Sequence, residues 1–408
     1  MKIDIAIIGG GAAGFFTAIN LKRKQPHLKI AIFEKSKTLL GKVQISGGGR
    51  CNVTHACFDN QTLVSYYPRG SKELLSVFER FNPTNTIEWF KKEGIELKTE
   101  SDGRMFPISN TSETIVNCFL NACSKLGIEI YTQHAFESFT RTQWGFTLTV
   151  NSNIWECKNL VMCSGSSNQI WHLLKENGID IIPPVPSLFT FNIKHPLIKD
   201  LMGISLPDAI VSLDLKDKIS KNQLKSFTQK GPVLITHWGL SGPGILKLSS
   251  IGARLLSNLA YKFNITLNAV GLEYEMVFES LKKHKTLHSK KSTLTNPQFG
   301  LSNRFWQNIC ELSLETSKNW SDVSNSEMQL LAKNLTSFQL EVKGKSTFKD
   351  EFVTSGGVNL KTVDFKTMSS KTIEDLYFAG EVLDIDALTG GFNFQAAWSE
   401  AWVISESI

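Results

Sequence analysis

Three glycines near the start of the chain have the spacing of a backbone turn that can bind an anion. Gly9, Gly11 and Gly14 form a G-x-G-x-x-G pattern between an apolar run, Ile3–Ile8, and an expected helix that begins near Phe15. The first glycine permits a tight turn, the second lets the backbone approach a pyrophosphate, and the third lets the helix pack against the strand. The free N–H groups at the start of the helix then face the anion. The segment therefore predicts a site for a dinucleotide.

A carboxylate follows at the distance that such a site requires. The second apolar run, Ile30–Glu34, ends about twenty residues after the last glycine, where a ribose hydroxyl needs an acceptor. NAD and FAD both contain this ribose and a pyrophosphate, so these residues do not separate the two cofactors.

The far end of the chain favours FAD. Residues 376–379 read as a short buried strand, Gly380 permits a close backbone approach, and Glu381 and Asp384 bring acceptors to the carboxyl end of that strand. FAD has a ribityl chain of hydroxyls that NAD lacks, and we expect Asp384 to bind it. Gly390 and Gly391 then precede a helix, whose N–H groups suit the N1 and C2 carbonyl edge of a flavin.

The segment from Gly41 to His55, GKVQISGGGRCNVTH, contains three consecutive glycines. Such a run is entropically costly, so we interpret it as a place where a ligand approaches the backbone. Lys42 and Arg50 can offset phosphate charge or contact a substrate carboxylate. For Arg50, a structural bridge between loops and a catalytic role are equally open.

The full set of expected cofactor-binding residues combines these positions with those that the family resemblance described below implies, among them the turn from Gly391 to Gln395. The set is Gly9, Gly11, Ala13, Gly14, Glu34, Lys35, Gly41, Lys42, Gly48, Gly49, Arg50, Cys51, Asn52, Phe136, Gly165, Gly380, Glu381, Asp384, Gly391, Phe392, Asn393 and Gln395. Phe136 is included on topology alone, as a neighbour of the adenine. The candidate general acid or base is His237, because the glycines around THWGLSGPG predict a turn that faces a cleft; a structural role beside Trp238 stays open.

Composition sets the outer limits. The chain has 408 residues, 41% of them hydrophobic, a formal net charge of +6 and a pI near 8.8. Its apolar runs are too short to span a bilayer, its first residues already begin a strand, and its seven cysteines lack a framework spacing, so we expect a cytoplasmic protein. No histidine pattern predicts a metal site. The basic stretch KKHKTLHSKK at 282–291 has no aromatic residue and reads as a solvated helix end.

The breaks in pattern predict an α/β fold with three parts. A Rossmann-like FAD-binding domain is built from both chain ends, 1–188 and 356–408, and a β-barrel-like domain covers 189–270 and 336–355. A helical insertion covers 271–335. Helices are expected at 71–81, 84–94 and 111–127, and a small strand meander is expected between 128 and 165.

Over nearly its whole length the chain resembles the bacterial BaiN and YhiN type of FAD-dependent NAD(P) oxidoreductases, also described as aminoacetone oxidase family FAD-binding enzymes. The segments GGGAAG, SGGGRCNVTH, PPVPSL, LITHWGLSGPGILKLS, VTSGGVNL and GGFNFQAAWSEAW carry the resemblance. It implies noncovalent FAD, with NAD(P)H as the candidate electron donor. One departure is the shortened glycine turn in VMCSGSSNQIWHLLKENG, which puts some flavin-edge contacts in doubt.

Three functions follow as hypotheses. The first is hydride transfer from NAD(P)H through FAD to an unsaturated or carbonyl-conjugated small molecule. The second is an oxidase that oxidises amines or amino acids and produces peroxide. The third, which the sequence favours least, is an RNA-associated flavoprotein. Disulfide reduction is disfavoured, because Cys51 and Cys57 have the wrong spacing and Cys118 and Cys123 fall on opposite sides of an expected helix. The sequence specifies neither the substrate nor the oligomeric state.

Overall fold

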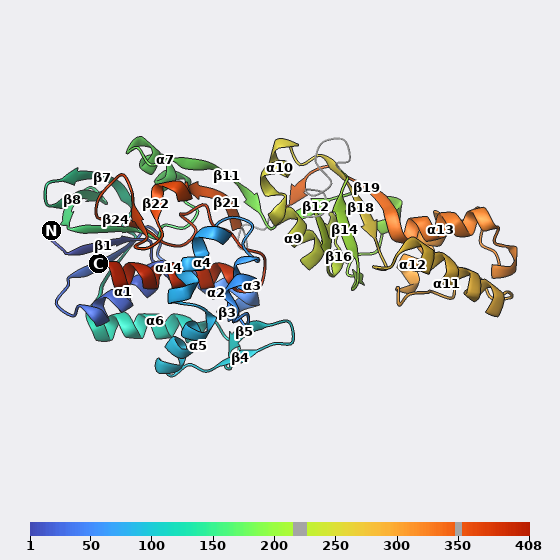
Figure 1. Ribbon diagram of the computed structural model, residues 1–408, viewed down its shortest axis with the longest axis horizontal. Coiled ribbons are helices and arrows are strands. Elements are labelled where there is room, and N and C mark those ends of the chain that lie inside the picture. The colour runs from blue at the N-terminus through green and yellow to red at the C-terminus, as the bar shows by residue number, and fades with distance from the viewer. Residues whose placement is uncertain (215–226, 347–352) are drawn as a thin grey trace. The chain divides into compact units, whose positions relative to one another are not determined.

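The computed structural model describes residues 1–214, 227–346 and 353–408 (Figure 1). The chain forms two compact units, one of Met1–Val185 with Lys349–Ile408 and one of Pro186–Phe348. The first unit is thus assembled from both chain ends, and the chain's N- and C-termini both belong to it.

A mostly parallel sheet forms the centre of the first unit. Its strands, in spatial order, are β22 (Val363–Asp364), β23 (Ser369–Ser370), β24 (Leu376–Phe378), β10 (Asn159–Met162), β1 (Ile5–Ile8), β2 (Ile30–Glu34) and β6 (Glu129–Thr132). From β24 to β6 the neighbours are parallel, with Ile5 opposite both Asn159 and Ile30, and Leu160 opposite Leu376. The C-terminal strand therefore lies two places from the N-terminal one. This is the Rossmann-type α/β fold that the sequence predicts.

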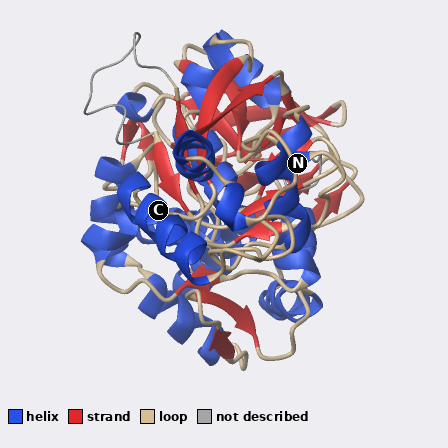
Figure 2. Ribbon diagram, turned by 90° about the vertical axis from the view of Figure 1, so that its right-hand side faces the viewer, coloured by secondary structure: helices blue, strands red, loops and turns tan. Residues whose placement is uncertain are grey.

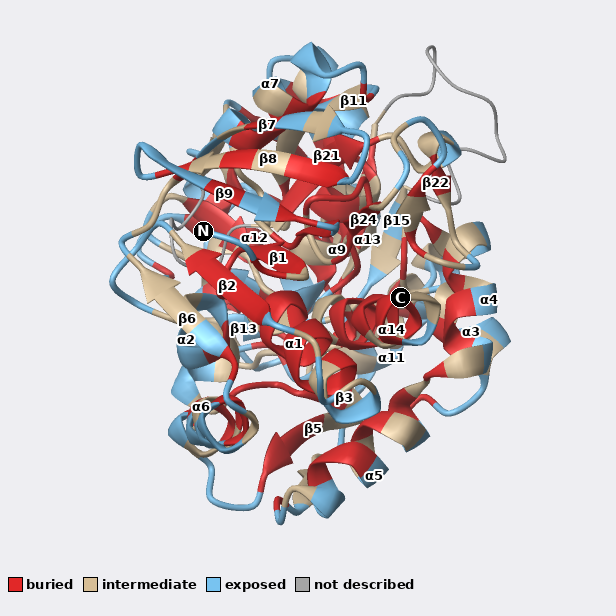
Figure 3. Cartoon of the chain, turned by 90° about the vertical axis from the view of Figure 1, so that its left-hand side faces the viewer, coloured by how far each residue is buried: buried red, intermediate tan, exposed pale blue. Residues whose placement is uncertain are grey.

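Two helices from the opposite ends of the chain pack against each other. They are α1 (Ala12–Lys24) and α14 (Phe392–Ser407), which lie side by side. Most of α14 is buried, as Figure 3 shows, because its sequence is apolar around nearly the whole helix rather than along one stripe. Phe16 of α1 meets Trp398 of α14 with ring centroids 5.3 Å apart. The two chain ends thus share one core.

The rest of the first unit surrounds this sheet. Its elements are α2 (Gly41–Gly49), β3 (Thr54–His55), α3 (Asn60–Val64), α4 (Ser71–Arg80), α5 (Pro83–Lys92), β4 (Leu97–Thr99), β5 (Arg104–Pro107), α6 (Glu113–Leu126), β7 (Phe136–Thr142), β8 (Gly145–Val150), β9 (Asn153–Cys157), α7 (Asn168–Glu176), β11 (Ile181–Ser187), β21 (Val353–Val358) and the 3-10 turn η3 (Leu360–Thr362). The three helices expected between residues 71 and 127 are confirmed. The expected meander forms as β7–β8–β9, but residues 129–132, which were expected to begin it, form β6 of the parallel sheet.

The second unit has two antiparallel sheets and a group of helices. Figure 2 shows the strands of the protein in red and its helices in blue. One sheet has the order β13 (Ser205–Leu206), β16 (Val233–Ile235), β17 (Gly239–Ser241), β12 (Thr190–Asn192) and β20 (Lys345–Ser346). The other has the order β15 (Thr228–Lys230), β14 (Ile210–Leu213), β18 (Phe263–Asn268) and β19 (Phe338–Val342). The other elements are η1 (Pro196–Ile198), α9 (Pro243–Ile251), α10 (Ala253–Asn258), α11 (Tyr274–Leu287), α12 (Asn303–Glu311), η2 (Trp320–Asp322) and α13 (Asn325–Ser337).

Helices α11 to α13 lie between β18 and β19 along the chain, in the segment expected to be helical, and α13 extends two residues past its expected end. They share one hydrophobic core with both sheets, in which Trp306 and Trp320 are fully buried. The division of this unit into a β-barrel-like domain and a distinct helical insertion stays a prediction. Helices α9 and α10 were not foreseen, although Pro243 after Gly242 is a typical helix start.

Candidate cofactor site

The first glycine turn joins β1 to α1, and its glycines differ in what surrounds them. Gly9 has φ +116°, and a Cβ there would lie 2.3 Å from the carbonyl oxygen of Cys163. A Cβ on Gly14 would lie 2.1 Å from the carbonyl oxygen of Gly9. At Gly11, in contrast, an added Cβ meets no atom within 4 Å. The protein's own packing therefore requires Gly9 and Gly14, whereas Gly11 faces open space.

Glu34 ties the end of β2 to this turn. Its Oε2 accepts a hydrogen bond from the Gly10 N–H (2.9 Å), and its Oε1 accepts one from the Ser36 N–H (2.8 Å). Each carboxylate oxygen has a further lone pair, so Glu34 can still accept from a ribose hydroxyl. The neighbouring Lys35 is exposed.

The C-terminal segment reaches the same place. A Cβ on Gly380 would lie 3.3 Å from the Cβ of Ala13, in the first turn of α1. Glu381 forms an ion pair with Lys42, and a Cβ on Gly165 would lie 3.9 Å from its Oε2. Segments that are far apart in the sequence thus meet at the carboxyl edge of the sheet, beside the glycine turn.

The glycine-rich segment adds more open backbone. Gly47, Gly48 and Gly49 have φ of +59°, +69° and +82°, so they interrupt the helical geometry of α2. A Cβ on Gly47 would lie 2.7 Å from the Phe106 ring, but one on Gly48 or Gly49 would meet nothing within 4 Å, as at Gly11 and Gly41. Side chains added at these four positions would extend into open space along three stretches of backbone. This arrangement fits an extended dinucleotide that needs close backbone contact.

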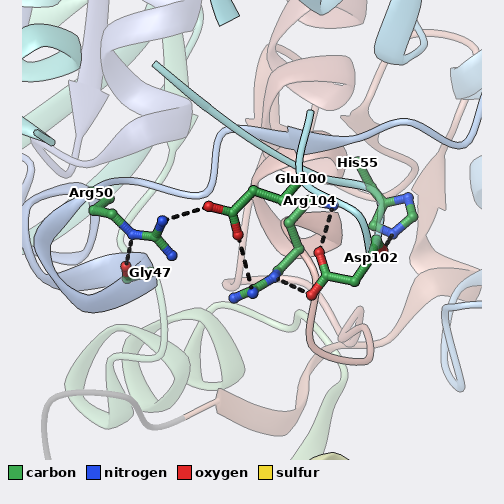
Figure 4. A network of polar contacts seen from close by, with 6 residues as sticks. All are labelled: Gly47, Arg50, His55, Glu100, Asp102 and Arg104. Atoms are coloured by element: carbon green, nitrogen blue, oxygen red, sulfur yellow. Dashed lines mark hydrogen bonds and ion pairs between the residues drawn. The ribbon is translucent and has the colours of Figure 1, made fainter. Parts of the chain in front are cut away.

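Arg50 forms a bridge between loops, as Figure 4 shows. Its guanidinium donates to Glu100 Oε1 (2.6 Å) and to the carbonyl oxygen of Gly47 (3.2 Å), and lies 4.0 Å from the centroid of the Phe106 ring. Glu100 also pairs with Arg104 (3.3 Å). Of the two roles left open for Arg50, the structure contains the bridge, and the catalytic role stays a prediction.

The turn before α14 is held by polar side chains that the sequence marked as cofactor ligands. Asn52 accepts from the Gly391 N–H (2.9 Å) and donates to the carbonyl oxygen of Thr54 (3.0 Å). Asn393 accepts from the Ala387 N–H (3.0 Å). A Cβ on Gly391 would lie 2.7 Å from the carbonyl oxygen of Thr54. These contacts fix the backbone of the turn that is expected at the flavin edge.

Three predicted ligands are buried in ways that favour structural roles. Gln395 is fully buried and accepts from the hydroxyls of Thr54 (2.5 Å) and Thr86 (2.9 Å), while its amide N–H donates to Ser399. Phe136 is 5% exposed and stacks on Phe139. Cys51 is fully buried, and burial raises the pKa of its thiol to about 12, so it carries no thiolate at neutral pH. Their contact with a cofactor stays a prediction.

A family comparison now adds to this geometry. A family model described as the HI0933-like protein Rossmann domain matches residues 3–407. The chain belongs to this family. With the Rossmann sheet built from both chain ends, this confirms the prediction of an FAD-dependent oxidoreductase.

Individual relatives of this HI0933-like protein have different names. Two are named ribosomal RNA dihydrouridine synthase. The one from Escherichia coli is 26% identical, over 100% of this chain and 98% of the relative. The one from Haemophilus influenzae is 30% identical, over 98% of this chain and 97% of the relative. A 3-dehydro-bile acid delta(4,6)-reductase from Clostridium scindens is 24% identical over 98% of this chain and 97% of the relative. In fold, the chain is similar to a 3-ketosteroid-delta4-(5alpha)-dehydrogenase from Rhodococcus jostii RHA1, with a TM-score of 0.50 and 10% identity over 100% and 97% of the two chains.

The HI0933-like fold also brings His55 to this region, a residue that the sequence did not single out. Its ring stacks on Phe392 with centroids 4.6 Å apart, and its Nε2 lies 3.1 Å from the carbonyl oxygen of Asp102. Its Nδ1 is buried and has no hydrogen-bond partner among the residues that the structure describes. Burial lowers the pKa of this imidazole. His55 is therefore a neutral group beside the turn expected at the flavin edge.

His237, the histidine that the sequence favoured, belongs to the second unit. It is exposed in the turn between β16 and β17, which the Thr236 N–H closes by donating to the carbonyl oxygen of Gly239 (2.8 Å). The expected turn is confirmed, and the catalytic role stays a prediction.

Metal and membrane features are absent within the described ranges. There, no group of three His, Cys, Asp or Glu side chains is arranged to hold a metal ion. No helix of the described residues has the length and apolar character needed to cross a membrane.

A buried carboxylate lies beneath the site of this HI0933-like protein. Glu400 of α14 is fully buried; its Oε2 accepts from the Gly380 N–H (2.6 Å), and its Oε1 has no partner within the described part of the chain. Burial raises the pKa of Glu400 to about 8, and the bond from Gly380 opposes this shift in part. The folded protein therefore holds Glu400 protonated at neutral pH.

Glu400 should make stability fall as the pH rises. Between about pH 4.5 and 8 the unfolded chain loses this proton while the folded chain keeps it, so the free energy of unfolding decreases across that window and levels off above it. For wild type we expect a decrease on the order of 5 kcal/mol that Glu400→Gln lacks. Urea unfolding of both proteins at several pH values measures the difference. If the free energies of unfolding of the two proteins change with pH in parallel, Glu400 is not the group responsible.

Proposed function

We propose that this protein reduces a carbon–carbon double bond conjugated to a carbonyl group, with NAD(P)H as the hydride donor. The observation that carries the proposal is a chemistry common to the named relatives. Dihydrouridine differs from uridine by two hydrogens on a ring double bond conjugated to a carbonyl. A delta(4,6)-reductase of a 3-dehydro bile acid removes double bonds conjugated to the C3 carbonyl. Full-length similarity to relatives with both of these names supports the same reaction class for this protein.

The chain's own residues would hold the cofactor as follows. The N-terminus of α1 at Gly11 would bind the pyrophosphate, Glu34 the adenosine ribose and Asp384 the ribityl chain. The turn at Gly391 would lie along the flavin edge. Bound FAD supplies the hydride-transfer chemistry, while the protein supplies position and charge.

Reduction of a conjugated double bond also needs a proton at the carbon next to the carbonyl. We propose His55 as the side chain that delivers it, because its Nδ1 is unpaired and it lies beside Phe392. Its lowered pKa means that it is protonated for only a small part of the time at neutral pH. Turnover through His55 should therefore decline as the pH rises above its pKa.

His55→Gln should stay yellow and lose roughly 100-fold in turnover, the usual contribution of a general acid. Reduction of the flavin by NAD(P)H should be unchanged, whereas reoxidation by substrate should slow and lose its pH dependence. His237→Gln is the matched control. Unchanged reoxidation in His55→Gln, or an equal loss in both variants, would remove His55 from the proposal.

Anaerobic mixing separates reductase from oxidase. A reductase requires that NAD(P)H bleach the flavin and that an unsaturated carbonyl compound restore its colour. Bleaching by an amine or amino acid, with peroxide formed in air, would instead favour the oxidase.

For the substrate we propose uracil within RNA, ahead of a free small molecule. The two relatives named for ribosomal RNA are 26% and 30% identical, against 24% for the bile acid reductase. The sequence alone favoured a small molecule. Unmodified ribosomal RNA transcripts, incubated with the protein and NADPH and then digested, should contain a nucleoside two hydrogens heavier than uridine. Restoration of flavin colour by a steroid dienone but not by RNA would favour the small molecule.

A further inference from the structure

The positive charge of the chain is concentrated in the second unit. Residues 186–348 contain 20 Lys and Arg against 12 Asp and Glu, a formal net charge of +8. The remaining residues contain 24 Lys and Arg against 26 Asp and Glu, a net charge of −2. The FAD-binding unit is thus slightly acidic and the other unit clearly basic. Such asymmetry is typical of proteins with a polyanionic partner.

The densest part of this charge covers the last turns of α11 and the residues that follow it. Residues 282–291 contain five lysines, two histidines and no carboxylate. Lys283, Lys290 and Lys291 are exposed. Lys282 pairs with Glu279 (2.7 Å), and Lys285 donates to the carbonyl oxygen of Val323 (2.5 Å).

A cavity of about 490 Å³ opens beside this segment. Its polar lining is Lys282, Lys285, Thr286, Ser289, Ser321 and Asn325. Each of these side chains can donate a hydrogen bond, and no carboxylate lines the cavity. Ammonium, hydroxyl and amide donors around one hollow suit phosphate oxygens.

We propose that this cavity and residues 282–291 bind the phosphate backbone of RNA. The proposal rests on RNA being the substrate of the proposed function. Because the segment contains no aromatic side chain that could stack on a base, the contact is with the backbone and independent of base sequence. The second unit would hold the RNA while the FAD-binding unit carries out the reduction.

The test measures binding of the full-length, FAD-loaded protein to a ribosomal RNA transcript over a range of salt concentrations. Lys282→Gln with Lys285→Gln should weaken binding about tenfold near physiological salt and reduce the salt slope by about 1.4, from two lost contacts of about 0.7 each. Lys283→Gln with Lys290→Gln, both on exposed side chains, should act in the same direction without risk to the fold. The control is Lys91→Gln with Lys92→Gln, which removes the same charge from exposed positions of α5.

The outcomes separate this surface from the proposed function. If all three double variants bind RNA as well as wild type does, the proposed RNA-binding surface is wrong, even if wild type reduces uracil. If both 282–291 variants lose RNA and the control does not, the surface stands, even if no reduced uracil forms. If wild type binds vesicles of anionic phosphatidylglycerol but no RNA, the proposal is overturned in favour of a membrane surface.

Discussion

Gly11→Val should give a folded protein that does not retain FAD. Gly11 has φ −98°, which any residue can adopt, and a Cβ there meets no protein atom within 4 Å. The valine side chain would instead occupy the space in front of the N-terminus of α1, where we expect the pyrophosphate. We expect the affinity for FAD to fall at least about tenfold, equivalent to about 1.4 kcal/mol of binding free energy, so that less FAD is retained. The ratio of flavin to protein absorbance after gel filtration measures it.

Gly14→Val provides the contrast. Its Cβ would lie 2.1 Å from the carbonyl oxygen of Gly9, which is backbone and cannot move aside cheaply. This variant should therefore be destabilised or insoluble, while Gly11→Val keeps the unfolding midpoint of FAD-free wild type. A Gly11→Val protein with full flavin content would contradict the placement of the pyrophosphate.

The sequence predicted the parts of this site that depend on local backbone rules. A glycine turn between a buried strand and a helix has one well-known geometry, so Gly9, Gly11 and Gly14 could be given separate roles in advance. Gly380 could be placed near the turn because parallel strands align their carboxyl ends at one edge of a sheet. Its approach to Ala13 confirms that expectation.

Pairings across long sequence separations could not be predicted in this way. His55 meets Phe392, and Arg69 meets Asp386, only after the chain ends come together. The burial of Glu400 also contradicts the pattern rule that charged residues face water. Likewise, the sequence marked Gln395 as a ligand because it lies in the right turn, whereas its amide contacts the hydroxyls of two buried threonines and Ser399.

Arg69→Ala should strongly destabilise the loop that follows β24, because Arg69, just before α4, pairs with Asp386 in that loop. Asp386 is fully buried, and the Arg69 guanidinium donates to both of its carboxylate oxygens through Nε and Nη2. Removing the arginine leaves a buried carboxylate without its cation, which costs about 3–5 kcal/mol. Because Asp384 is two residues away, FAD affinity should fall as well. Urea unfolding with and without excess FAD measures both effects.

Arg80→Ala is the matched control for this experiment. Arg80 also forms an ion pair across the two chain ends, with Glu406 (2.5 Å), but both side chains are about one-third exposed. An exposed pair contributes about 1 kcal/mol or less. Replacing the buried pair by apolar residues, Arg69→Met with Asp386→Leu, should recover much of the stability that Arg69→Ala loses, since no charge then stays buried. If Arg69→Ala costs no more than Arg80→Ala, the carboxylate of Asp386 does not depend on Arg69, and the pair does not hold the loop that carries Asp384.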